Sequence, residues 1–173
     1  MKNPIVLVCL FLLLSACAST PEKPLSPAAR QAILLNALSE GGVRRIEVGD
    51  ELRLILPNAR FFINGTPRLN VSAYPTLTRV VTLLNQRKNL GIEVLTWTPT
   101  PNLKQENSGL AKQQALAIED YLLDHGLNTR IIVAKAWSRE GQSHKKGVCF
   151  NEDQVPILST EIRTRHLHPE DSE

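Results

Sequence analysis

Apolar residues recur at helical spacing in three segments of the chain. The first helix is expected over residues 27–42, where Ser26 can cap the first turn and a Gly-Gly pair ends the apolar stripe. The second is expected over residues 72–88, with Ser72 as its cap, and the third over residues 107–125. Each segment has one apolar face, which predicts that each helix packs against another element.

Strand patterns lie between these helices. Residues 43–48 and 51–56 flank Gly49-Asp50 and predict a β-hairpin, because leucines alternate with other residues in the second segment. Residues 57–70 are expected to form a loop. The remaining strands are expected over residues 92–97, 130–136 and 155–165. This order predicts an α+β sandwich in which helices cover one face of a sheet.

The first residues are typical of an exported protein. Lys2 precedes an apolar run over residues 5–14, which is shorter than the roughly 20 residues a membrane-spanning helix needs. Leu14-Ser15-Ala16-Cys17 follows and resembles the bacterial lipobox. The sequence therefore predicts a lipoprotein signal peptide over residues 1–16, with Cys17 as the lipid attachment site. The alternative is an ordinary signal peptide with an incidental cysteine.

Two features refine this prediction. Ala18 follows the predicted lipid site, and by resemblance to enterobacterial sorting a neutral residue there favours the outer membrane. We therefore expect lipid anchoring in the inner leaflet of the outer membrane, with the domain in the periplasm. Residues 17–26 contain two prolines among small and polar residues, which predicts an extended, lipidated tether.

Composition limits the remaining possibilities. The chain has 173 residues, is 42% hydrophobic and has a formal net charge of +3. It is too apolar for a disordered chain and too weakly basic to indicate nucleic-acid binding. We expect one folded domain over residues 43–166 and a flexible tail over residues 167–173. With Cys9 removed and Cys17 acylated, Cys149 is the last thiol, and we favour a structural role over a reactive one.

Catalytic signatures are missing from the sequence. It contains no Gly-rich phosphate loop, nucleophile elbow or paired metal motif, so we expect no enzyme activity and no cofactor besides the covalent lipid. His166 and His168 share a strand face, but no third ligand lies near them, which favours exposed histidines over a metal site. His144-Lys145-Lys146 is interpreted as a solvated loop, with anionic lipid or an acidic partner as the alternative.

Four aromatic residues are candidates for a protein interface. Trp97 and Trp137 end two strands at what we expect to be the same end of the sheet, where they either cap the core or anchor a partner. Phe61 and Phe62 are adjacent, so in an extended segment they point to opposite sides. At most one of the two phenylalanines is then easily buried, and an exposed one is an interface candidate.

One ordered motif points to a family. Asn107 is followed by Leu110-Ala111, Gln114-Ala115, Ile118 and Leu122, and the preceding strand ends in Thr96-Trp97-Thr98-Pro99. From Leu54 to Trp137 the chain resembles the OmpA-like C-terminal domain of peptidoglycan-associated lipoproteins and flagellar stator proteins. The resemblance implies a β-α-β-α-β-β two-layer sandwich, to which the hairpin and the first helix are added.

The departures from this motif concern charge. In the family, an aspartate and an arginine hold the charged ends of diaminopimelate in the wall peptide. This chain has Pro99 and Gln114 at the matching positions. A proline side chain accepts no hydrogen bond, and a neutral amide cannot pair with a carboxylate as a guanidinium does. Hydrogen bonds to charged groups contribute about 1.5–3 kcal/mol each, so losing both weakens binding about a hundredfold or more.

A second resemblance is narrower. Several segments resemble the DotK/IcmN lipoproteins of the Dot/Icm type IVB secretion system. They are Leu56-Pro57, the phenylalanine-bearing loop, Thr66-Pro67-Arg68-Leu69-Asn70, Tyr74 and the segment 124–132. This implies a structural subunit of an outer-membrane core complex, whose partners are other subunits of that complex. The alternative is a peptidoglycan-binding lipoprotein that tethers the outer membrane to the cell wall through Thr98, Asn107 and backbone donors.

Overall fold

A computed structural model describes residues 25–87, 90–97, 106–137 and 158–166. The chain divides into two units, residues 1–30 and 31–173. The predicted signal peptide with Cys17, the basic loop 144–146, Cys149, His168 and the predicted tail lie outside the described residues.

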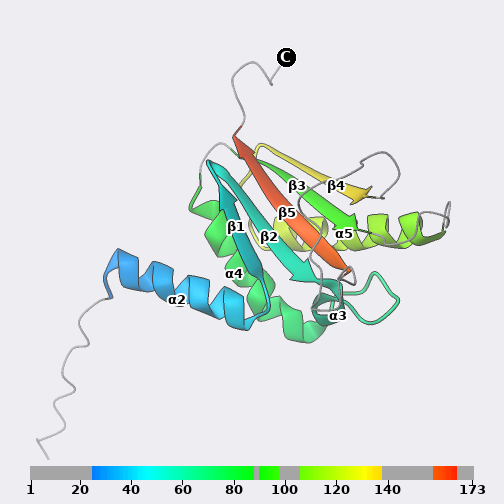
Figure 1. Ribbon diagram of the computed structural model, residues 1–173, viewed down its shortest axis with the longest axis horizontal. Helices are drawn as coiled ribbons and strands as arrows, with labels where there is room; N and C mark the ends of the chain where they lie inside the picture. Colours follow the sequence, from blue (N-terminus) through cyan, green and yellow to red (C-terminus); the bar gives the residue numbers. More distant parts are fainter. Residues whose placement is uncertain (1–24, 88–89, 98–105, 138–157, 167–173) are drawn as a thin grey trace, which may run out of the picture. The chain divides into compact units, whose positions relative to one another are not determined.

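The described elements follow the predicted order (Figure 1). Their bounds are α2 Pro27–Glu40, β1 Arg44–Val48, β2 Glu51–Pro57, α3 Asn58–Phe61, a 3-10 turn Val71–Ala73, α4 Tyr74–Asn85, β3 Leu90–Trp97, α5 Glu106–Asp124, β4 Ile131–Trp137 and β5 Ser159–His166.

The five described strands form one mixed sheet in the order β1-β2-β5-β3-β4. Within this sheet β3 and β4 run parallel, and β5 lies antiparallel between β2 and β3. The helices α4 and α5 lie on one face of the sheet (Figure 1). The α+β sandwich is therefore confirmed, and the last described strand is inserted at the centre of the sheet.

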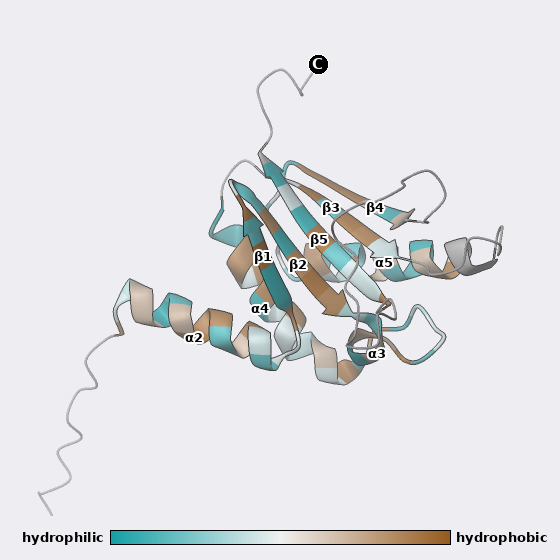
Figure 2. Ribbon diagram, in the orientation of Figure 1, coloured by the Kyte–Doolittle hydropathy of each residue, from teal (hydrophilic) through white to brown (hydrophobic). Residues whose placement is uncertain are grey.

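Alternation along the strands positions the core. Leu52, Leu54 and Leu56 are fully buried on the helix side, and so is Ile162 on β5. Figure 2 shows hydrophobic and hydrophilic bands alternating along β1 and β2. The α4 residues Leu77, Val80, Val81 and Leu84 close this core from the helix layer, as their spacing predicts.

Helix α4 begins later than expected. Ser72 is not its cap: the backbone N–H of Ser72 donates to the Asn70 side chain, and a 3-10 turn precedes the helix. Pro75 falls in the first turn of α4, where its missing N–H leaves no hydrogen bond unmade. Helix α5 is followed by Gly126, whose φ of 84° lies in the left-handed region that favours a residue without a side chain.

The segment 57–70 is more ordered than the predicted loop. Asn58–Phe61 form one helical turn, and Phe62 pairs with Leu69 across a short antiparallel bridge. Backbone bonds from Ile63 N to Arg68 O (2.9 Å) and from Asn70 N to Phe61 O (2.9 Å) fasten the returning chain. We call residues 62–69 the bridge loop.

This local structure overturns the prediction for the two phenylalanines. Phe61 is helical and Phe62 is extended, with φ −121° and ψ 154°, so their side chains do not alternate as they would in a strand. Both are buried, with exposed fractions of 0% and 3%. Neither is an exposed interface anchor.

Candidate functional site

Gln114 and Thr96, two positions that the family resemblance implicates in ligand binding, belong to a chain of buried polar groups. Gln114 is on α5, Asn58 begins α3, and Thr160 and Thr96 are paired on the neighbouring strands β5 and β3. All four are buried, and the threonines are fully so. With the carbonyl of Thr66 in the bridge loop they form what we call the amide network.

Hydrogen bonds run through the amide network in one direction. Thr160 donates its hydroxyl proton to Asn58 Oδ1 at 3.0 Å, so it accepts from Thr96 at 2.8 Å. Asn58 Nδ2 donates to Gln114 Oε1 at 3.0 Å. Gln114 Nε2 then donates to the carbonyl of Thr66 at 3.0 Å. Each amide group therefore has its oxygen and one N–H engaged within the protein.

The sequence explains why these residues meet here. Asn58 follows directly after β2, and its backbone N–H donates to the carbonyl of Leu158, just before β5. Thr66 lies at the tip of the bridge loop, where Gly65 takes a φ of 69°. Gln114 lies among α5 residues that face the sheet, between the buried Ala111 and Ala115. The network thus joins α5, the bridge loop and three strand ends.

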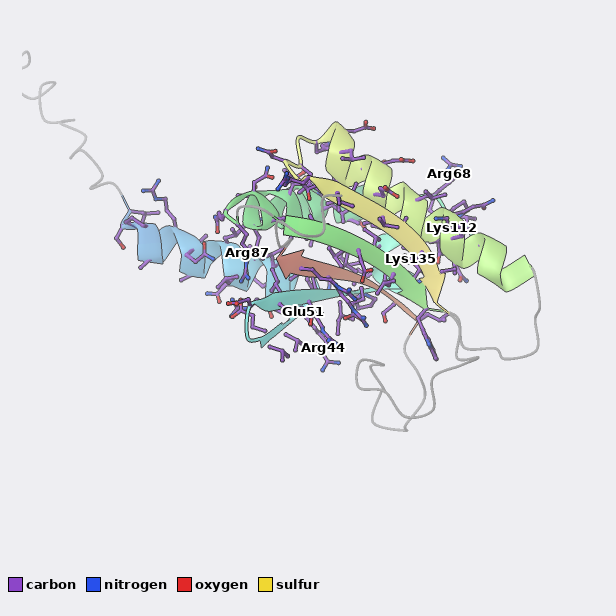
Figure 3. All side chains as sticks on the ribbon, turned by 90° about the horizontal axis from the view of Figure 1, so that it is seen from above. Arg44, Glu51, Arg68, Arg87, Lys112 and Lys135 are labelled. Carbon is purple, nitrogen blue, oxygen red and sulfur yellow. The ribbon has the colours of Figure 1, made fainter. Side chains whose placement is uncertain are left out.

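The amide network carries no charge. Among the described residues, Arg60, Arg68 and Lys112 each lie two positions from a network residue in the sequence, and all three are exposed. Figure 3 labels Arg68 and Lys112. The Lys112 ammonium donates to the Ala134 carbonyl on β4, so it does not replace the missing guanidinium at position 114. Gln114 is 7% exposed, and it could offer a ligand only a neutral N–H.

The structure joins some of the residues that the sequence analysis assigned to this site. It brings together Thr96 and Gln114 through Thr160 and Asn58. Thr98 and Pro99 lie outside the described residues, as do the side chains of Asn107 and Trp137. Sequence reasoning missed Asn58, Thr66 and Thr160, and the only signal for Asn58 was its place after the strand-ending Leu56-Pro57 pair.

The two tryptophans end neighbouring strands, as predicted. Trp97 and Trp137 are partners in the parallel register of β3 and β4. Trp97 is 8% exposed, which contradicts its use as an exposed anchor. Its indole does not face the core beneath α5, because Trp97 alternates with the helix-facing Thr96 along β3 and so lies on the opposite face of the sheet.

Clustered metal ligands and membrane-spanning helices are both missing from the described part of the chain. Within those residues there is no group of three or more metal-ligating side chains. The same residues contain no helix that is both long and apolar enough to cross a membrane.

Comparison with known proteins identifies the family of this chain. The OmpA family model matches residues 61–151, just over half of the chain. No curated protein sequence matches the chain.

Solved structures share the fold at low sequence identity. The periplasmic domain of Helicobacter pylori MotB is 19% identical, with a TM-score of 0.57 over 73% of this chain and 83% of that one. A putative MotB-like protein of Desulfovibrio vulgaris is 15% identical, with a TM-score of 0.61 over 80% and 88%. The cell wall anchor of the Pseudomonas aeruginosa T6SS is 16% identical, with a TM-score of 0.60 over 79% and 96%. Because the family model matches more than half of the chain, the chain belongs to the OmpA family.

Proposed function

We propose that this chain is an outer-membrane lipoprotein that acts as a structural subunit of a type IVB (Dot/Icm) secretion core complex. Its acyl chains on Cys17 fix it to the membrane, and its OmpA-like domain contacts other subunits. The domain does not hold diaminopimelate, and it catalyses no reaction. The amide network carries this proposal, because a buried neutral Gln114 occupies the position of the family's ligand-binding arginine.

The chemistry of the site supports a structural role. A wall-peptide carboxylate would have to compete with Asn58 and Thr66 for an amide that is already engaged. Opening those bonds leaves buried polar groups unpaired, at about 1–3 kcal/mol each, without a charged hydrogen bond in return. The site therefore favours holding the bridge loop to α5 over binding a charged ligand.

The second candidate function is a cell-wall tether. The related Pseudomonas aeruginosa protein is a cell wall anchor, and this chain shares its fold. A tether of this kind would bind the wall peptide through Thr98, Asn107 and backbone donors, without the charged pair.

Binding to purified sacculi separates the two functions. We expect the wild-type chain to remain in the supernatant, and a Pro99→Asp/Gln114→Arg variant to be retained about a hundredfold more strongly because it regains both charged contacts. Circular dichroism establishes that the variant is folded. Retention of the wild type equal to that of the variant would support the tether and contradict our proposal.

The lipid anchor is tested separately. We expect labelled palmitate on the wild-type chain, globomycin-sensitive processing, and loss of both label and membrane association in Cys17→Ser. A labelled, membrane-bound Cys17→Ser chain would show that the anchor lies elsewhere.

A further inference from the structure

The hairpin strand β1 forms a free edge of the sheet. Among the described strands it pairs only with β2, and all five of its residues are exposed. Figure 3 shows Arg44 projecting from this edge, on the side of the sheet away from β4. A free edge presents unpaired backbone groups to which another strand can add.

The hairpin register identifies which backbone groups are free. Val48 pairs with Glu51 across the two-residue turn, so Val48, Ile46 and Arg44 exchange hydrogen bonds with β2. The N–H and C=O groups of Arg45 and Glu47 therefore point away from the sheet. Within the described residues no other partner is found for these backbone groups.

The sequence of β1 is complementary to itself when read antiparallel. With Ile46 on a two-fold axis, Arg45 of one copy faces Glu47 of the other, and the reverse pair forms on the far side of the axis. The residues that face each other are those with outward backbone groups, as a hydrogen-bonded antiparallel pair requires. The free backbone groups and the opposite charges of Arg45 and Glu47 therefore favour the same antiparallel register between two copies of β1.

The surroundings of the edge fit a second copy. Ile46 is 36% and Val48 59% exposed, and both lie on the sheet face opposite Arg45 and Glu47, where a second β1 would cover them. Within one copy Glu47 pairs with Arg87 at 2.8 Å and with Arg45 at 3.5 Å. Both pairs are solvent-accessible contacts that contribute about 0–1 kcal/mol, so Arg45 of a second copy can compete for the Glu47 carboxylate. A hollow of about 460 Å³ lies next to the beginning of β1 and is lined by Leu35, Arg44 and Arg45 among others.

We propose that two copies of this chain associate through antiparallel β1–β1 pairing centred on Ile46, which joins their sheets into one. The alternative is that the charges of β1 only protect the edge against pairing. Oppositely charged cross-strand pairs stabilise such a pairing, and like charges oppose it.

Disulfide trapping tests the register. In the full chain with Cys9, Cys17 and Cys149 replaced by serine, Ile46→Cys places two thiols on the axis, with Cα atoms about 4.5 Å apart in a non-hydrogen-bonded pair. We expect a cross-linked dimer on mild oxidation. Val48→Cys is the matched control, because two copies of residue 48 lie four residues apart along the strands, roughly 13 Å. No cross-link at position 46, or equal cross-linking at 46 and 48, would overturn the proposal.

Charge exchange tests the complementarity in the same Ile46→Cys chain. Arg45→Glu and Glu47→Arg alone each place like charges opposite one another, and we expect cross-linking to fall about tenfold. The double variant, and a mixture of the two single variants, restore opposite charges and are expected to regain it. Equal cross-linking in all four samples would contradict the pairing.

Discussion

Gln114 has two hydrogen-bonding partners from different parts of the chain, the Asn58 side chain and the Thr66 carbonyl. A guanidinium at this position could not accept from Asn58, because arginine has no acceptor. Glutamine at this position therefore differs from arginine in more than charge, because its oxygen allows the site to be closed by the protein's own amide groups. The described residues contain no buried side-chain nitrogen or oxygen that lacks a partner.

Removing this amide should lower stability. Gln114→Leu keeps the approximate volume but leaves Asn58 Nδ2 and the Thr66 carbonyl without partners, and we expect a loss of about 2–4 kcal/mol in the free energy of unfolding. The loss is measured as a fall in the midpoint of urea denaturation at unchanged m. The neighbouring Gln113 is exposed, so Gln113→Leu should change stability by less than about 0.5 kcal/mol. Equal effects of the two substitutions would show that the network contributes nothing.

The sequence identified Gln114 and Thr96 only through the family motif. Asn58 and Thr160 reach the site because α3 turns back after β2 and because β5 is inserted between β2 and β3. Hydrophobic periodicity predicts neither feature. A single helical turn is too short to show a helical pattern, and the alternation of buried and exposed residues along a strand does not specify the strand's neighbours in the sheet. The same turn at Asn58–Phe61 is why both phenylalanines are buried against expectation.

At the scale of elements, hydrophobic period and turn residues predicted most of the fold. The hairpin and α5 begin and end within about a residue of their expected bounds, because Gly49-Asp50 and Gly126 mark sharp stops. The beginning of α4 was misplaced because Ser72 and Asn70 are both suitable caps, whereas in the structure Asn70 caps the preceding 3-10 turn and α4 begins without a side-chain cap. When two nearby residues can both cap a helix, the sequence does not show at which of them the helix begins.

A glycine within α5 and the glycine just after it should respond in opposite directions to substitution by alanine. Gly126 has a φ of 84°, so Gly126→Ala strains the turn after α5 and should lower stability by about 1 kcal/mol. Gly109 lies within α5, and a Cβ there would meet nothing within 4 Å. Gly109→Ala should therefore raise stability by about 0.5–1 kcal/mol. Thermal or urea unfolding decides the signs, and a shared sign would refute this description of the helix end.

A charged row on the sheet face opposite α4 and α5 gives a third stability prediction. Arg163 Nε donates to Glu161 Oε1 at 2.8 Å in a partly buried pair, and Arg53 lies 3.8 Å from the same oxygen. Arg163→Met leaves the buried Glu161 with its weaker partner, and we expect a loss of roughly 3 kcal/mol. Arg165→Met is the control, because its contact with Glu93 is solvent-exposed and contributes less than about 1 kcal/mol.

The pKa of Arg163 determines how the stabilisation by the Arg163–Glu161 pair changes at high pH. Burial lowers the pKa of Arg163, whereas its hydrogen bond to Glu161 and the nearby carboxylates raise the pKa. Together the raising effects exceed the lowering effect of burial, so the pKa lies above its ordinary value. A raised pKa means that the stabilisation is present below the unfolded-state pKa and is lost only as pH rises through the folded-state value. The difference between wild type and Arg163→Met should therefore stay constant from about pH 6 to 10, as measured by urea unfolding at each pH.

At the scale of the whole molecule, the fold is shared with proteins that are less than a fifth identical to this chain. Their common architecture depends on burial at alternate positions, which many sequences satisfy. Function depends on the few residues at the site, and the described part of that site in this chain is the neutral amide network.

Equilibrium titration with a diaminopimelate-containing stem peptide shows whether the site is closed to the charged wall ligand. The full chain should show no saturable binding below about millimolar peptide, because no guanidinium faces the ligand carboxylate at position 114. The Pro99→Asp/Gln114→Arg variant is expected to bind about a hundredfold more tightly. Micromolar binding by the wild-type chain would contradict a site closed by its own amides.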